Sequence, residues 1–269
     1  MSALFVAVGA VVGGVGGAVL DPAGQRLAER SRAADERRRA ERAARAAESE
    51  PPGAATDNVD GAVTSGAPSP LRPTPYLPIG PSRARQLAVA VVCAVLLAAA
   101  SAHFGAHLIV VSYWVFFLTL VTVSVTDLTH RLVPRHLVYA ALVVMVPIDI
   151  AVSAVDGTWH DLVGAAIAGG VAFGLFFLIW FFVPRGMGFG DVRLAGLIGV
   201  GLGYLSLLHA YLGFLGGFLL GLMVGVVVLV RSSEGRKTRV PFGPPLAGGA
   251  VAATLWGGAA AHVLFHTAG

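Results

Sequence analysis

Long apolar runs constrain the fold of this chain more than any other feature. The 50 residues from His136 to Arg185 carry only three formal charges before the final arginine. Hydrophobic residues make up 56% of the 269 residues and charged residues only 13%, whereas soluble globular domains carry about 25% charged residues. A chain this long and this apolar cannot bury its nonpolar side chains in one soluble core. The sequence therefore predicts an all-α polytopic membrane protein.

The lengths of the apolar runs predict how many times the chain crosses the membrane. A bilayer core requires about 20 apolar residues per helical span, and this length divides the chain into eight. The predicted spans lie near residues 1–20, 86–104, 107–126, 136–154, 162–183, 192–208, 210–230 and 241–266. The sequence thus predicts a first transmembrane helix (1–20), one long loop (21–85) and a seven-helix membrane domain (86–269).

The basic residues predict the orientation. All 19 Lys and Arg lie in residues 26–85, at 131 and 135, at 185 and 193, or in residues 231–239. With eight spans, these four places share one side of the membrane, and the positive-inside rule makes that side cytoplasmic. We therefore expect a multi-pass protein of the inner (cytoplasmic) membrane. The high sequence pI, near 9.7, is then a topology signal rather than a sign of nucleic-acid binding.

The loop of residues 21–85 has two parts. Its first half is rich in Ala, Arg and Glu, which indicates a solvated helix or a partly disordered arm. Its second half, Pro51 to Pro81, holds 8 of the 15 prolines and predicts an extended linker. The single cysteine, Cys93, excludes an intramolecular disulfide and a multi-cysteine zinc site. We predict no globular domain in this loop and no metal or cofactor.

Two aspartates lie at the predicted cytoplasmic ends of spans, where a charge close to hydrocarbon is costly and usually functional. Asp127 ends the third span, and Pro134 follows seven residues later, at a position favoured in the first turn of a helix. Asp191 begins the sixth span after "GMGFG". Gly188 and Gly190 of that stretch remove side-chain bulk, so the backbone can approach another chain closely or take a positive φ.

Each aspartate also has a purely structural interpretation. An aspartate at a helix start, such as Asp191, commonly caps the helix and complements its dipole. Asp127 lies at a helix end, which suits the dipole badly, and Arg131 one turn later could pair with it.

Two carboxylates that face each other across a membrane cleft suggest the chemistry of an aspartic protease. Like charges a few ångströms apart cannot both ionise, so the pair shares a proton. The ionised member takes a proton from water, while the protonated member polarises the scissile carbonyl. This chemistry requires no metal and no covalent nucleophile. We expect the glycines before Asp191 to let an extended substrate peptide pass beside it.

Three stretches resemble motifs of the prepilin peptidases, the type IV leader peptidase family of GxGD-type intramembrane aspartic proteases. "GFGDVRLAGLIG" looks like the GxGD motif, "DLTHRLVPRHL" resembles the first catalytic motif, and "VPFGPPLAGGA" (240–250) resembles a third stretch that opens the last span. The resemblance implies that Asp127 and Asp191 are the catalytic pair. It implies that the other motif residues shape the substrate site: Gly188, Gly190, Pro134, Pro241 and Gly243.

The resemblance also implies the reaction. Family members cut the short basic leader from prepilins and pseudopilins at the cytoplasmic face, just before an apolar helix. Many also methylate the new N-terminus with S-adenosylmethionine. This chain lacks the paired CxxC zinc motifs that members often carry in the first cytoplasmic loop, and its first span lacks the family's Asn- and Arg-containing signature. We therefore expect a peptidase, and we do not extend the resemblance to N-methyltransferase activity.

Two alternatives stay open from the sequence. One is a GxGD protease with other membrane substrates, such as a presenilin-like or preflagellin peptidase. The other is a transporter or assembly protein without enzymatic activity, in which the aspartates bind ions or protons. A transporter usually places its acidic residues near the middle of the membrane, whereas these two lie at span ends.

Overall fold

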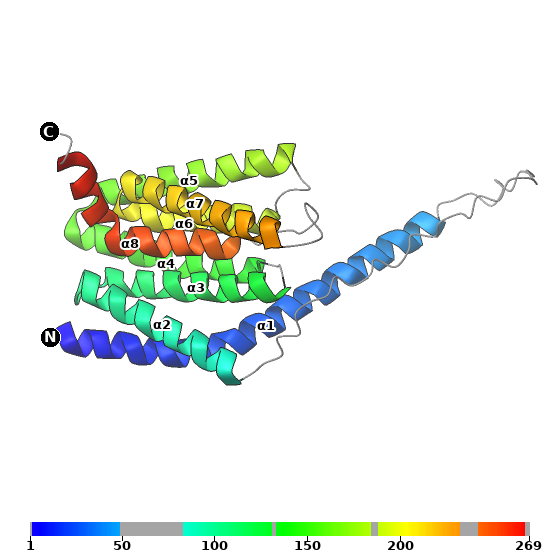
Figure 1. Ribbon diagram of the computed structural model, residues 1–269, viewed down its shortest axis with the longest axis horizontal. Helices are drawn as coiled ribbons and strands as arrows, with labels where there is room; N and C mark the ends of the chain where they lie inside the picture. The colour runs from blue at the N-terminus through cyan, green and yellow to red at the C-terminus, as the bar shows by residue number, and fades with distance from the viewer. Residues whose placement is uncertain (1, 49–82, 131–132, 184–187, 232–241, 267–269) are drawn as a thin grey trace, which may run out of the picture.

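The computed structural model describes residues 2–48, 83–130, 133–183, 188–231 and 242–266, and all of the regular structure in these ranges is helical. The helices are α1 (Ser2–Glu48), α2 (Arg83–Phe104), α3 (Ile109–His130), α4 (Arg135–Asp156), α5 (Trp159–Phe182), α6 (Phe189–Leu205), α7 (Leu207–Arg231) and α8 (Gly243–His266). Helices α2 to α8 lie side by side in a bundle, and α1 runs along α2 before extending away from it (Figure 1). The predicted all-α class is confirmed.

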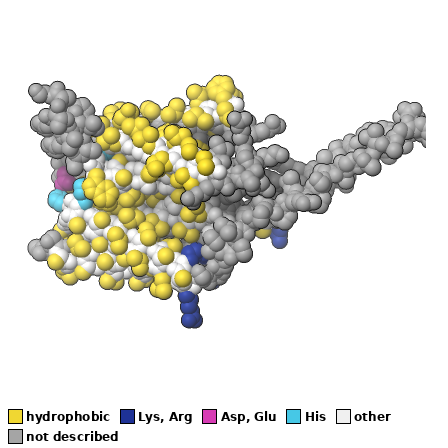
Figure 2. Space-filling view, viewed as in Figure 1, with side chains coloured by type: hydrophobic (Ala, Val, Ile, Leu, Met, Phe, Trp, Pro, Cys, Tyr) yellow, Lys and Arg dark blue, Asp and Glu magenta, His cyan; other side chains and the backbone are white. Residues whose placement is uncertain are grey.

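Five helices of the described chain are long and apolar enough to cross a membrane, namely α2, α3, α4, α5 and α7. The apolar part of α1, Ala3–Ala18, is shorter, and α6 has 17 residues. Hydrophobic side chains cover much of the visible outer face of the bundle (Figure 2), and many large ones are exposed, such as Phe182 at 72%. This surface suits a multi-pass membrane protein. The predicted number of eight spans is not confirmed.

Helix α1 differs from the prediction because it does not end near residue 20. It continues for 47 residues, to Glu48. The Ala-, Arg- and Glu-rich part of the predicted loop therefore forms a helix, which is the first of the two alternatives for that segment. Ala, Arg and Glu are all strong helix formers, which explains why the helix continues beyond its apolar part. The proline-rich part of the predicted loop lies outside the described residues.

Glycines allow close packing between neighbouring helices. A Cβ atom on Gly13 of α1 would lie 2.5 Å from the carbonyl oxygen of Cys93 in α2. A Cβ atom on Gly199 of α6 would lie 2.5 Å from the carbonyl oxygen of Ala168 in α5. Such small residues let helix backbones approach each other in membranes. Cys93 itself is buried and free, as expected for a small apolar residue in a helix.

Helix α3 lies in the interior of the bundle and carries Asp127. Its residues Phe116, Phe117 and Leu120 are fully buried. The hydroxyl of Tyr113, also buried, donates a 2.8 Å hydrogen bond to the carbonyl oxygen of Gly201 in α6. This bond joins the two helices that carry the predicted catalytic aspartates.

Ser206 separates α6 from α7, in a region where the sequence shows no charge. Its backbone is extended, with φ −179° and ψ 162°, and its hydroxyl oxygen accepts a 3.1 Å hydrogen bond from the backbone N–H of His209. Serine is a favoured N-cap because its side chain satisfies a backbone N–H in the first helical turn. The predicted boundary between the sixth and seventh spans is therefore three residues too late.

Candidate active site

Asp127 lies in the last turn of α3 and is only 6% exposed. Its Oδ2 accepts a 3.0 Å hydrogen bond from the backbone N–H of Gly243, the first residue of α8. The next two residues, Pro244 and Pro245, have no N–H, so Gly243 provides the only backbone donor of these three. The start of a helix complements a negative charge. The carboxylate of Asp127 is unfavourable at the C-terminal end of α3, and the N-terminal end of α8 compensates for this.

Gly243 must be a glycine for the carboxylate of Asp127 to keep this position. A Cβ atom on Gly243 would lie 2.7 Å from Oδ2 and 3.2 Å from Cγ of Asp127. The third sequence motif, through Gly243, thus provides Asp127 with a hydrogen-bond donor and with space for its carboxylate. Pro241 of the same motif lies outside the described residues, as does Arg131, the predicted alternative partner of Asp127.

Asp191 is the third residue of α6 and caps that helix. Its Oδ2 accepts a 3.3 Å hydrogen bond from the N–H of Gly188, while its own N–H donates to the carbonyl oxygen of Gly188 at 3.0 Å. The N-cap residue itself is Gly188, so Asp191 stabilises the helix start from its third position rather than as the N-cap. The cap uses one of the two carboxylate oxygens, so capping holds the side chain in place without excluding a chemical role.

The two aspartates lie close enough for the charge of Asp127 to disfavour a charge on Asp191. The residues around them also meet. A Cβ atom on Gly190 would lie 2.7 Å from Cβ of Val133, which precedes Pro134, the N-cap residue of α4. The end of the α3–α4 connection therefore packs against the start of α6.

This contact corrects part of the sequence interpretation. We expected the glycines before Asp191 to make room for a substrate or to take a positive φ. In the structure the absent side chain of Gly190 makes room for Val133 of the chain itself. Gly188 has φ −80°, and the described glycines with positive φ are Gly105 and Gly157. Pro134 is the N-cap residue of α4 rather than the first residue inside the helix.

Sequence analysis did not single out a third buried aspartate, Asp149 of α4. Asp149 is 3% exposed, and its carboxyl interacts with the hydroxyl of Ser112. The Tyr204 hydroxyl donates to the Asp149 carbonyl oxygen at 3.3 Å and lies 2.9 Å from the hydroxyl of Ser153. Ser112 precedes Asp127 by 15 residues of α3, which corresponds to about 22 Å of helix. Asp149 is therefore remote from the candidate site.

Arg193 follows Asp191 by two residues, and sequence analysis used it only to predict topology. Its guanidinium carbon lies 4.4 Å from the centre of the Phe189 ring and 5.7 Å from that of Tyr139 in α4. Cations are attracted to aromatic ring faces at such distances. The arginine thus helps to hold the start of α6 against α4.

The fold and the site define a class of protein: a helical bundle of the multi-pass membrane type, in which two separate helices place a carboxylate at the same end. Residues 114–228, which include both Asp127 and Asp191, match the model of the type IV leader peptidase family. The matched region ends before Gly243.

The chain is also similar to two proteins of known name. The chain is 31% identical over 172 residues to a prepilin leader peptidase/N-methyltransferase of Bacillus subtilis (strain 168), covering 63% of this chain and 65% of the relative. It is 30% identical over 145 residues to a protein of the same name from Stutzerimonas stutzeri, covering 51% and 47%. The chain thus spans less than two thirds of the length of either relative. No solved structure matches the chain.

Proposed function

We propose that this protein is an intramembrane aspartic endopeptidase that removes the basic leader peptide from prepilin-like or pseudopilin proteins at the cytoplasmic face of the inner membrane. The observation that carries the proposal is that Asp127 and Asp191, from different helices, lie within electrostatic range of each other in a region that matches the type IV leader peptidase family. Its partners are the prepilin substrate and the lipid bilayer, with no nucleic acid and no metal or cofactor.

The arrangement suggests different catalytic roles for the two aspartates. The N–H of Gly243 and the start of α8 both complement a negative charge on Asp127. Asp127 then acts as the base that takes a proton from the attacking water. Asp191, whose ionisation Asp127 opposes, carries the shared proton and donates a hydrogen bond to the scissile carbonyl. When the intermediate collapses, a proton passes to the leaving amine.

The experiment that tests this function is leader removal from a prepilin co-expressed with the protein and followed by gel mobility. Asp127→Asn and Asp191→Asn should each abolish cleavage while the protein still inserts into the membrane. Asp149→Asn is the matched control, because Asp149 is also a buried aspartate but lies far from the pair. Near wild-type cleavage by either Asp127→Asn or Asp191→Asn would rule out the shared-proton mechanism.

The cytoplasmic position of the site follows from the one-sided distribution of Lys and Arg. Reporter fusions at positions 60 and 235 should both be cytoplasmic, and a fusion at position 158 should be external. Position 158 lies between α4 and α5, at the end of α4 opposite to Pro134. A reporter at 60 that proves external would contradict the proposed topology.

The proposal does not extend to methyl transfer, although both relatives carry N-methyltransferase in their names. The first loop of this chain has no cysteine for a structural zinc and little apolar bulk for a core, so it has no means to preorganise two substrates. Mass spectrometry of the processed N-terminus should therefore show the unmethylated mass. An added 14 Da that depends on this protein alone would refute this part of the proposal.

A further inference from the structure

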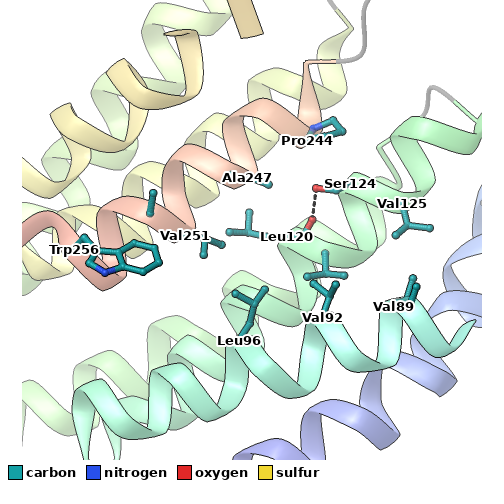
Figure 3. A pocket seen from close by; sticks show the side chains of 14 residues that line it. Val89, Val92, Leu96, Leu120, Ser124, Val125, Pro244, Ala247, Val251 and Trp256 are labelled. Atoms are coloured by element: carbon teal, nitrogen blue, oxygen red, sulfur yellow. Dashed lines mark hydrogen bonds between the residues drawn. The ribbon is translucent and has the colours of Figure 1, made fainter. Parts of the chain in front are cut away.

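Helices α2, α3 and α8 enclose an apolar groove on the outer surface of the bundle, with a volume of about 440 Å³. Figure 3 shows Val92 and Leu96 of α2 opposite Val251 and Trp256 of α8, with Leu120 of α3 between them. Such a volume falls within the range of roughly 300–1,000 Å³ that is typical of ligand pockets.

The lining offers few polar side-chain groups to an occupant. Apart from the indole N–H of Trp256 at its far end, its polar side chain is that of Ser124, and the Ser124 hydroxyl donates a 2.7 Å hydrogen bond to the carbonyl oxygen of Leu120 in its own helix (Figure 3). Because the wall between these two polar groups is apolar, its occupant must be apolar where it touches that wall.

One end of the groove lies beside the candidate active site. Pro244 lines this end and directly follows Gly243, whose N–H binds Asp127. Val125, also in the lining, precedes Asp127 by two residues. From there the groove follows α8 as far as Trp256, which is 63% exposed. The rise along α8 from Pro244 to Trp256, 12 residues later, is about 18 Å, more than half of a bilayer core of about 30 Å.

We propose that this groove binds the apolar transmembrane helix of the substrate, on one side of the bond that Asp127 and Asp191 cleave. The inference rests on the proposed function. A substrate chain whose scissile bond lies at the aspartates extends from the site in two directions. The groove follows one of these directions into the bilayer. At that depth a polypeptide must satisfy its backbone hydrogen bonds internally, so the bound segment is a helix.

The walls of the groove suit a helix better than they suit a flexible acyl chain. The lining of α8 includes Ala247, Gly248 and Ala252, and small residues let two helix backbones approach closely in a membrane. Together with α2 and α3, these residues form a seam along which a fourth helix can lie. Contact along this seam would hold the scissile bond at the level of the aspartates.

Two neighbouring valines of α2 allow a matched test. Val92 lines the groove and is 47% exposed, whereas Val91 is 60% exposed and does not line it. Val92→Trp fills the groove with a large ring, while Val91→Trp adds the same ring to the adjacent lipid-facing surface. Both variants are assayed on a prepilin that keeps its apolar helix and on a peptide that contains only the leader and the cleavage junction.

We expect Val92→Trp to raise KM for the helix-containing prepilin by about tenfold, the effect of 1.4 kcal/mol of lost binding, with kcat little changed. Cleavage of the short peptide should not change, and Val91→Trp should match the wild type with both substrates. Equal cleavage of the prepilin by both variants would overturn the proposal. An equal loss of activity of Val92→Trp on the short peptide would also overturn it, because the groove would then not act by binding the substrate helix.

A second readout does not depend on cleavage. A photo-reactive benzophenone amino acid at position 92 of the Asp127→Asn variant should cross-link to the helix-containing prepilin, and the same group at position 91 should not. Cross-links from position 92 to lipid alone would refute the groove as a helix site. If the wild type cleaves neither substrate, the proposed function fails, but the cross-link still decides whether the groove binds the helix.

Discussion

The contact between Gly243 and Asp127 makes Gly243→Ala an informative perturbation. A Cβ atom at this position would lie 2.7 Å from Oδ2 of Asp127, about 0.7 Å short of the 3.4 Å at which ordinary contact begins. The backbone of Gly243 is not in the left-handed region, and alanine keeps the N–H that binds Asp127. The substitution therefore changes only the position that the Asp127 carboxylate can take.

The expected cost follows from that displacement. A misplacement of about 1 Å at a catalytic group can reduce the rate by about a hundredfold, so a shift of about 0.7 Å should reduce kcat by roughly 10- to 100-fold. This corresponds to about 1.4–2.7 kcal/mol of transition-state stabilisation. KM should change little, because the groove that we propose for the substrate helix is not altered.

The assay is the rate of leader removal by the purified protein in liposomes, together with its thermal unfolding. Gly258→Ala is the matched control on the same helix, because a Cβ atom at Gly258 would meet no other atom within 4 Å. The control should keep both its activity and its melting temperature. If Gly243→Ala retained more than half of the wild-type kcat, the argument that Gly243 positions the Asp127 carboxylate would be wrong.

Two further predictions concern the packing that brings the site together. Gly199→Val should destabilise the protein by about 1–3 kcal/mol, as overpacking does, because a Cβ atom on Gly199 would lie 2.5 Å from the Ala168 carbonyl oxygen. Gly174→Val is its control, because a Cβ atom on Gly174 would meet no other atom within 4 Å. In a thermal melt the control should unfold like the wild type. Tyr113→Phe should cost about 0.5–1.5 kcal/mol, because it removes the hydrogen bond to Gly201 in α6. The exposed Tyr211, at 63%, is its control, and equal melting temperatures for Tyr113→Phe and Tyr211→Phe would show that the bond does not hold α3 to α6.

The sequence by itself determined the helices and the two aspartates. Apolar runs of about 20 residues predict helices, because a segment in lipid must form all of its backbone hydrogen bonds within itself. The predicted centres of the bundle helices agree with α2 to α8. Asp127 and Asp191 were recognisable because the residues that mark them, Pro134 and the preceding glycines, are close in the sequence.

Only the tertiary structure decided which residues surround those aspartates. Gly243 lies 116 residues from Asp127, and nothing near Gly190 in the sequence indicates that Val133 fills its space. The same holds for the buried Asp149 and for the groove between α2, α3 and α8. The physical reason is that lipid-facing and interior-facing side chains are both apolar in a membrane protein. Hydropathy therefore reveals where a helix lies along the chain, but it carries little information about which face of that helix meets a neighbour.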